Sequence, residues 1–239
     1  MKILAFDSTA KVASVAVCDN DKLLSQYTVD NGLTQSELLL PMAEDMLREL
    51  KLDFSDIELF AASVGPGSFT GVRIGTALIK GLAFGKGTPC GEVSTLEALA
   101  YNLEGINGII VPAMDARRGQ VYTAIFRSNE NCVERLTEDD AISIANLAKI
   151  LEAYEGERIY LCGDGYEVAR RELKERGIKV EITPSLLINE NAASVAKVAY
   201  MNYKKGIYTL DRSVKPTYLR MPQAERERLE RINNGEVAK

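Results

Sequence analysis

The stretch from residue 61 to residue 85 places the strongest constraint on how this chain folds. It reads AASVGPGSFTGVRIGTALIKGLAFG and contains six glycines in 25 residues. An apolar strand-like run ends at Val64, a Gly-Pro-Gly-Ser turn follows, and from Phe69 the apolar residues recur at helical spacing. Glycine inside a helix costs about 1 kcal/mol against alanine, so Gly71, Gly75 and Gly81 need a steric reason. We expect a strand, a tight turn and a helix that another backbone approaches closely.

Two interpretations of these glycines remain open. Ser68, Thr70 and the helix N-terminus are candidates for contact with a phosphate group. The turn lacks the Lys-Ser or Lys-Thr pair of a P-loop, and its spacing is not that of a dinucleotide fingerprint. The alternative is close helix packing, internal or with a partner, along the face formed by Gly71, Gly75, Leu78 and Leu82.

The amino-acid composition excludes several classes of catalytic and metal-binding site. The chain of 239 residues contains no histidine, which excludes Ser-His and Cys-His nucleophile pairs, imidazole general bases and metal sites that depend on nitrogen ligands. The four cysteines are scattered singly, so we expect buried thiols and no metal site. Lys and Arg total 29 against 34 for Asp and Glu. The resulting net charge of -5 argues against a protein that binds nucleic acid without a partner protein.

The expected location is the cytoplasm. With 46% hydrophobic residues and no apolar run near 18 residues in length, the sequence predicts a globular chain without a membrane span. The first expected strand begins at Lys2, which leaves no room for a signal peptide.

The order of predicted elements occurs twice. The first half predicts three strands (2–7, 12–18, 22–29), a helix to Leu50 with Thr34 and Glu37 at capping-box spacing, then strand 57–64, the glycine-rich helix, strand 89–93 and a helix opened by Ser94. The second half predicts strands 109–115, 120–127 and 132–136, helix 143–154, strand 158–162, helix 167–176, strand 178–182 and helix 191–205.

This repetition predicts an α/β fold of two similar lobes with a cleft between them. We expect the first lobe to comprise residues 1–104 together with the helix at 190–206, the second lobe residues 105–189, and a C-terminal tail residues 207–239. The turns after the first strand of each half, residues 7–9 and 115–119, are then equivalent and face each other across the cleft. Arg117 and Arg118 in the second turn suit structural ion pairing, an interface or RNA contact, or an anion; their bulk leaves less space for a nucleotide.

Several segments together resemble the TsaB (YeaZ) family. They are FDSTAKVASVAV, QSELLLP, SVGPGSFTGVRIG, DARRGQVY and PTYLR, which occur in the family's order over nearly the whole chain. Members of this family are non-catalytic partners of TsaD in the synthesis of threonylcarbamoyladenosine beside the tRNA anticodon. Where the family commonly has a histidine before Ser-Glu, this chain has Gln35.

The resemblance implies a two-lobed, actin-like and Hsp70-like fold of the ASKHA class, built by duplication of a ribonuclease H-like unit. It implies TsaD as partner, TsaE together with it, TsaC as a further candidate, tRNA held indirectly through the complex, and a homodimer when the chain is alone. It assigns no catalytic residue, metal or firm cofactor to this chain, and it leaves ATP or ADP in the complex open.

The resemblance also implies that the helices at 36–50 and 69–85 form the partner-binding surface. The residues expected there are Leu39, Met42, Ala43, Met46, Leu47, Gly71, Val72, Gly75, Leu78, Ile79 and Leu82. We expect a bulky residue at position 75 to abolish the complex and leave the fold intact. Nucleotide contact, if present, is expected at Asp7, Ser8, Thr9, Ser68 and Thr70.

Two other functions are weighed against this one. An enzyme on an actin-like fold needs a carboxylate base such as Asp7 or Asp115 together with magnesium and a nucleotide; an inactive peptidase-like homologue belongs to the same alternative. A direct tRNA binder would use a local patch of Arg117, Arg118, Arg226, Arg228 and Arg231, against an unfavourable net charge.

Overall fold

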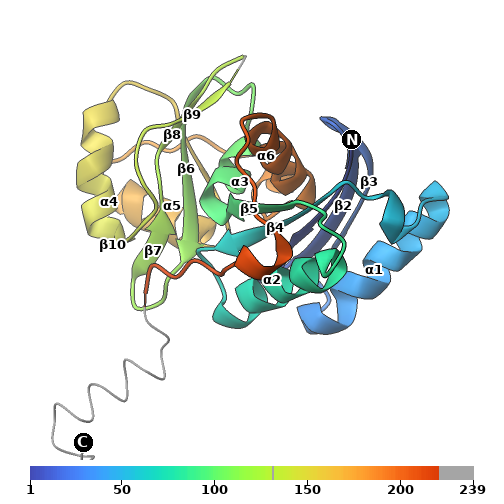
Figure 1. Ribbon diagram of the computed structural model, residues 1–239. Coiled ribbons are helices and arrows are strands. Elements are labelled where there is room, and N and C mark those ends of the chain that lie inside the picture. The colour runs from blue at the N-terminus through green and yellow to red at the C-terminus, as the bar shows by residue number, and fades with distance from the viewer. Residues whose placement is uncertain (131, 221–239) are drawn as a thin grey trace, which may run out of the picture.

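The computed structural model describes residues 1–130 and 132–220, which form two lobes built on two β-sheets (Figure 1). The first sheet has the strand order β3-β2-β1-β4-β5. Its first three strands form an antiparallel meander, and the other two run parallel to β1. The strands are β1 (Lys2–Asp7), β2 (Ala13–Asp19), β3 (Lys22–Val29), β4 (Leu59–Gly65) and β5 (Cys90–Ser94).

Helices cover both faces of this sheet. Side chains alternate along a strand, so Leu4 and Phe6 of β1 pack beneath α1 (Gln35–Leu50) and α2 (Phe69–Ala83). Ile3 and Ala5 point the other way, toward α3 (Thr95–Tyr101) and α6 (Ala192–Lys204). Because both faces are covered, every residue of β4 is buried.

The second sheet repeats the first. Its central strand β6 pairs antiparallel with β7 and β8, which β10 and β9 extend, and pairs parallel with β11. An isolated parallel bridge between Tyr160 and Glu181 lies beyond β11, where the first sheet has β5 beyond β4. The strands are β6 (Gly108–Asp115), β7 (Gln120–Thr123), β8 (Phe126–Ser128), β9 (Val133–Arg135), β10 (Asp140–Ser143) and β11 (Ile159–Cys162).

The expected duplicated, actin-like α/β architecture is therefore confirmed. Helices α4 (Ile144–Leu151) and α5 (Tyr166–Glu175) cover the outer face of the second sheet. On its inner face Leu96 and Leu99 of α3 pack against Ile110 and Phe126. The layers run from α1 and α2 through the first sheet, α3 and α6 and the second sheet to α4 and α5 (Figure 1). Because α3 contacts both sheets, the division at residue 104 stays a prediction.

Two predicted strands differ in the structure. The strand expected at 120–127 is interrupted between β7 and β8, because the amide of Ile125 donates to Thr137 Oγ1 and its carbonyl accepts from Leu136 and Thr137. The strand expected at 178–182 reduces to the single bridge at Glu181, and Ile182 beside it is 75% exposed.

Helix starts agree with the capping signals. Thr34 and Glu37 form the predicted capping box of α1, with Thr34 Oγ1 donating to the Glu37 carboxylate at 2.6 Å. Ser68, Ser94 and Ser143 each accept a backbone N–H at the start of α2, α3 and α4. Three of the four thiols are buried as expected, whereas Cys132 is exposed. No helix in the described part of the chain is long and apolar enough to cross a membrane.

Part of the predicted tail is packed against both lobes. Residues 209–220, which we call the strap, begin with a pairing between Thr209 and Cys90 at the edge of the first sheet. The amide of Thr217 donates to Val64 at 2.7 Å, and Arg220 Nη1 donates to Ala116 in the second lobe at 2.9 Å. Figure 1 shows the strap running from beside α2 to β7. The rest of the predicted tail, including Arg226, Arg228 and Arg231, lies outside the described residues.

Candidate functional site

Gly71 and Gly75 of α2 lie close to another segment, but that segment belongs to this chain. A Cβ placed on Gly71 would lie 1.7 Å from the carbonyl oxygen of Ser8, and one on Gly75 would lie 3.0 Å from Ser8 Oγ. Gly71, Gly75, Val72 and Ile79 are buried. The prediction that Gly71 and Gly75 leave room for a partner is therefore wrong, because the end of β1 already occupies that space.

The partner-binding face expected on α1 is also internal. Its five predicted residues are at most 8% exposed and pack in the core between the first sheet and the two helices: Leu39, Met42, Ala43, Met46 and Leu47. The adaptable Met side chains thus fill this chain's own core. Of the predicted interface residues, only Leu78 and Leu82 of α2 are partly exposed.

The polar groups of the turn after β1 form hydrogen bonds within the chain. Asp7 is 1% exposed, and its carboxylate accepts from Thr9 N, Thr9 Oγ1 and Ser63 Oγ at 2.9, 2.7 and 2.5 Å. Burial raises the pKa of Asp7, although these hydrogen bonds act in the opposite direction. Ser8 Oγ donates to Gly71 O at 2.8 Å, and Ser68 N donates to Thr9 O at 2.6 Å. Asp7 and Ser8 are therefore not available to a nucleotide, contrary to the prediction.

The equivalent turn after β6 is open. Arg117 and Arg118 both have left-handed backbone angles, with φ of 66° and 56°, and Gly119 follows with 69°. Arg117 Nη1 lies 3.2 Å from Asp115 Oδ2, and the Arg117 side chain is 80% exposed. The structural ion pair, one of the interpretations left open from sequence, is present at Arg117, while its exposure leaves the guanidinium accessible.

The two turns border a cleft of about 580 Å³ between the lobes. Asp115 N donates to Asp164 Oδ1 at 2.9 Å, and loss of solvent around the Asp164 carboxyl raises its pKa. Charged side chains of both signs thus face this space, and so do the predicted Ser68 and Thr70 at the start of α2. The cleft is lined by Thr9, Ala10, Lys11, Gln35, Gly67, Ser68, Phe69, Thr70, Met114, Asp115, Ala116, Arg117, Tyr122 and Asp164. Nucleotide contact here stays a prediction.

Glu190 is a buried acid that was not singled out from the sequence. It precedes α6, is 2% exposed, and among the described residues neither carboxyl oxygen has a partner within ordinary hydrogen-bond geometry. Burial, with the nearby charges of Asp7 and Asp164, raises the pKa of Glu190 to about 8. Nothing in its local sequence distinguishes it from an exposed glutamate before a helix. In residues 1–130 and 132–220, no group of three or more acidic or cysteine side chains is arranged to hold a metal ion.

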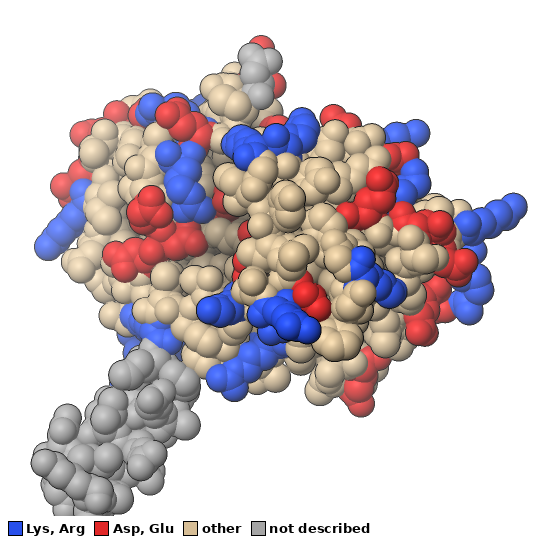
Figure 2. Space-filling view, in the orientation of Figure 1, with Lys and Arg blue, Asp and Glu red and all other residues tan. Residues whose placement is uncertain are grey.

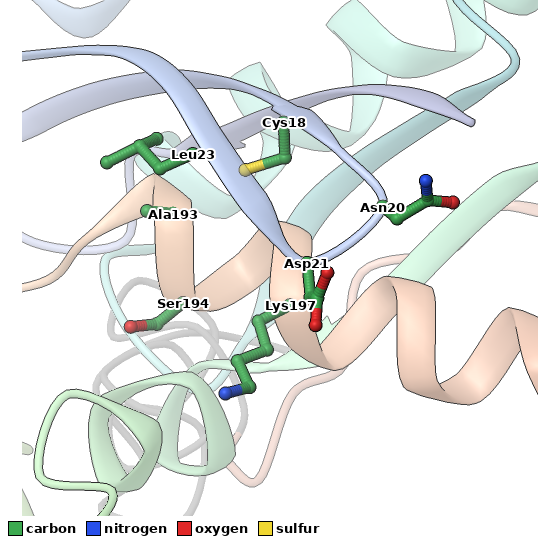
Figure 3. A pocket seen from close by; sticks show the side chains of 7 residues that line it. All are labelled: Cys18, Asn20, Asp21, Leu23, Ala193, Ser194 and Lys197. Atoms are coloured by element: carbon green, nitrogen blue, oxygen red, sulfur yellow. The ribbon is translucent and has the colours of Figure 1, made fainter.

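A smaller cavity of about 160 Å³ lies between the β2–β3 turn and α6 (Figure 3). Burial raises the pKa of its Cys18 thiol to about 11, so the thiol stays protonated. Lys197 extends away from Cys18 and pairs with Glu104, and Ser194 donates to Asn102. The reactive groups of this cavity therefore serve the fold.

The outer side of α2 carries two different flanks. Ile74, Leu78 and Leu82 recur at four-residue spacing, are only partly buried, and lie on the side of the helix opposite to Lys80. Beside these three residues Ala77 and Gly81 are exposed, and a Cβ on Gly81 would meet nothing within 4 Å. The fold itself therefore gives no reason for a glycine at position 81.

Comparison with known proteins places this geometry in a family. The family model "TsaD: tRNA N6-adenosine threonylcarbamoyltransferase" matches residues 34–227. The chain is 31% identical to the tRNA threonylcarbamoyladenosine biosynthesis protein TsaB of Escherichia coli (strain K12), over 92% of this chain and 95% of that protein. It is 28% identical to the TsaB of Bacillus subtilis (strain 168), over 96% and 99% of the two chains.

Similarity to a transferase itself is local, whereas similarity to TsaB is full-length. A tRNA N6-adenosine threonylcarbamoyltransferase of Erythrobacter litoralis is 35% identical over only 28% of this chain and 20% of its own length. Among solved structures, YeaZ from Pseudomonas aeruginosa superposes with a TM-score of 0.75 at 23% identity, covering 91% of this chain and 99% of its own, which supports the fold. The chain therefore belongs to the family that the TsaD model describes, and within it to the TsaB proteins of tRNA threonylcarbamoyladenosine biosynthesis.

Proposed function

We propose that this chain is a non-catalytic subunit that binds TsaD and supports threonylcarbamoyladenosine formation beside the tRNA anticodon. The full-length similarity to TsaB proteins supports the pathway. The observation that carries the binding role is the apolar flank of α2, which we define as Ile74, Ala77, Leu78, Gly81 and Leu82. This flank is left partly uncovered by the chain's own packing.

The shape of the apolar flank suits a partner helix. Ala77 and Gly81 are small and one turn apart, so a second helix can approach the backbone of α2 closely between them. Leu78 and Leu82 stand beside these two residues and offer side chains to the same partner. On the neighbouring helix α1, the apolar residue Leu40 is 36% exposed. The proposed site thus shifts outward from the predicted buried residues to this flank.

A non-catalytic role agrees with the groups that the chain offers. The sequence has no histidine, and the carboxylate of Asp7 is bound to Thr9 and Ser63. A phosphotransferase would need that carboxylate free for magnesium or for the acceptor hydroxyl. We expect the isolated chain to show no turnover of ATP. Hydrolysis above the rate of a heat-inactivated sample would restore the enzyme hypothesis.

Further assembly follows from the same proposal. We propose that TsaE joins the complex together with TsaD, with TsaC as a transient partner, and that tRNA reaches the chain within the complex in the cytoplasm. The apolar flank also suits a second copy of this chain when TsaD is missing. Light scattering on a sizing column should then give a dimer alone and a mixed complex after addition of TsaD.

The decisive experiment is Gly81→Leu in titration calorimetry against TsaD of the same cell. A Cβ at this exposed position meets no atom within 4 Å, so the free energy of unfolding should be unchanged or slightly higher. It fills the space that a partner helix would occupy. We expect affinity for TsaD to fall by at least about tenfold, equivalent to about 1.4 kcal/mol.

Lys174→Leu serves as the matched control, because it introduces the same side chain on the exposed face of α5 in the other lobe. It should bind TsaD as the unaltered chain does. Equal affinity of the Gly81→Leu variant and the control would place the interface elsewhere. Absence of any complex with the unaltered chain would reject the proposed function as a whole.

A further inference from the structure

Positive charge gathers on the other flank of α2, although the chain as a whole is acidic. Helix α2 and the strap together carry five basic residues and one acidic residue, against a net charge of -5 for the chain. Figure 2 shows Lys and Arg side chains gathered over this region, near the lower centre of the view. Segregation of charge on an acidic protein indicates a specific polyanionic partner.

The strap lies along α2 in the antiparallel direction, so that both segments contribute to one strip. Arg73 Nε donates to Tyr218 Oη at 2.8 Å, Lys80 Nζ donates to Val214 O at 3.4 Å, and Gly85 N donates to Asp211 Oδ2 at 3.4 Å. We call Phe69, Arg73, Lys80, Arg212, Lys215 and Tyr218 the basic strip. The 15 residues of α2 give it a length of about 22 Å.

Aromatic rings are interleaved with these charges. Phe69 and Tyr218 stack with ring centres 4.1 Å apart and planes within 1°. The guanidinium of Arg73 lies 5.0 Å from the Phe69 ring centre and 5.7 Å from that of Tyr218. Tyr218 is nevertheless 39% exposed. A base can therefore extend a stack that the protein has already assembled, with a cation beside it.

The carboxylates along the strip do not cancel its charge at the rings. Asp211 accepts from the amide of Gly85, and Glu92 accepts from the amide of Lys215 at 2.7 Å. Both are held at the Ala83 end and the sheet edge, whereas Tyr218 lies at the Phe69 end, beside the cleft. Beyond Tyr218, Arg220 continues the strip onto the second lobe, where its guanidinium lies 5.8 Å from the Tyr122 ring centre.

From this juxtaposition we infer that the basic strip is a docking surface for single-stranded or loop RNA. Nucleic acid is favoured over an acidic peptide because the strip offers stacked rings as well as cations, and bases use both. The inference deepens the proposed function by giving the tRNA of the complex a contact on this chain. It uses the flank of α2 that faces the strap, away from the apolar flank proposed for TsaD.

The first test measures fluorescence anisotropy of a labelled single-stranded RNA of about twelve nucleotides with the full chain, between about 50 and 200 mM salt. The combined variant Arg73→Gln, Lys80→Gln and Lys215→Gln should weaken binding at least tenfold and reduce the salt slope by about two. The control Lys22→Gln, Lys149→Gln and Lys174→Gln removes the same charge from exposed positions elsewhere and should bind normally. Equal losses in both variants would overturn the assignment.

The second test separates RNA from other polyanions. Tyr218→Leu should weaken RNA binding about tenfold, and Tyr218→Phe should restore it, because the phenyl ring keeps the stack with Phe69. Binding of polyphosphate or of a poly-glutamate peptide should be weaker than that of RNA and insensitive to either change. Equal binding of poly-glutamate and RNA would overturn the inference in favour of an acidic peptide partner.

The two proposals fail separately. The Gly81→Leu variant should bind TsaD more weakly and bind RNA as the unaltered chain does. The combined charge variant should bind RNA more weakly and bind TsaD as the unaltered chain does. If the chain binds TsaD but shows no salt-dependent RNA binding, either alone or in the complex, the basic strip is not a docking surface for RNA. The proposed function would then be unaffected. Loss of both properties in the charge variant, with an unchanged melting temperature, would mean that the two flanks are one interface and would overturn the separation.

Discussion

The first strand of each lobe ends in an equivalent turn, but the two turns differ in their exposure to solvent. In the first lobe Asp7, Ser8 and Thr9 are each 1% exposed and bonded to Ser63, to Gly71 and within the turn. In the second lobe the turn at 115–119 is open, and Arg117 reaches solvent. The same strand order thus produces a structural centre on one side and an accessible surface on the other.

The difference arises from the segment that packs on each first strand. Helix α2 places Gly71 directly over Ser8, so the first turn is covered by a helix at backbone contact. In the second lobe the close approach is made by the Gly163-Asp164-Gly165 turn against Ala113, which lies within β6 and before the turn. Arg117, Arg118 and Gly119 of the second turn therefore remain exposed. Fold similarity alone would have assigned both turns the same role.

The largest expected effect comes from breaking the first turn. Gly71→Ala places a methyl group against the Ser8 carbonyl, and we expect a loss of at least about 3 kcal/mol in the free energy of unfolding. Gly81→Ala in the same helix meets nothing and should stabilise the chain by about 0.5–1 kcal/mol. Urea unfolding measures both. A Gly71→Ala variant as stable as the unaltered chain would show that the turn can move away from the added methyl group at little cost in free energy.

The second prediction concerns Glu190, whose pKa is raised by burial and by the charges of Asp7 in the first turn and Asp164 beside the second. Its pKa in the folded chain is about 8, above the usual value of 4.5, so the folded state holds a proton that the unfolded state releases. The free energy of unfolding should fall as pH rises from about 5 to about 8, by up to about 1.4 kcal/mol per pH unit.

Glu190→Gln should flatten this dependence and leave the chain more stable than the unaltered one near pH 8. Urea unfolding at several pH values between about 5.5 and 8.5 gives both slopes. Glu181→Gln, which alters a partly exposed carboxylate earlier in the chain, is the control and should keep the slope of the unaltered chain. Parallel curves for Glu190→Gln and the unaltered chain would mean that Glu190 is already ionised in the folded state.

A smaller effect is expected where the strap meets the second turn. Arg220→Met removes the donors to Ala116 and Gln120 but keeps most of the apolar stem, and should cost about 1 kcal/mol. It should also speed proteolytic cleavage of the strap. Arg212→Met, on an exposed position of the same segment, should change neither quantity. Equal cleavage of both variants would mean that the first lobe alone holds the strap.

The smallest effect should come from Arg117→Gly. Glycine relieves a left-handed backbone angle of 66° at a gain of about 1 kcal/mol, and the exposed ion pair with Asp115 that is lost is worth about the same or less. The melting temperature should change by no more than a few degrees. A large drop would show that the second turn is as structural as the first.

Local signals in the sequence located most elements. The capping signals at Thr34 and Ser94 act within a few residues, so the starts of these helices could be predicted well. The interruption of the strand at 120–127 and the loss of the strand at 178–182 could not. Their hydrogen bonds depend on distant groups, such as Thr137 Oγ1 at the amide of Ile125 and Ile159 at the amide of Glu181.

For the candidate site, the sequence by itself determined which chemistry is available: no imidazole, a glycine-rich helix, and carboxylates after two equivalent strands. It also indicated that a glycine of α2 serves a close backbone contact, which holds for Gly71 and not for Gly81. Only the tertiary structure decided that Ser8 makes this contact, that Leu39 and Met46 are internal, and that the strap turns one flank of α2 basic and aromatic. The physical reason is that helical periodicity defines which residues share a face, whereas the neighbour that covers a face comes from segments more than 60 residues away.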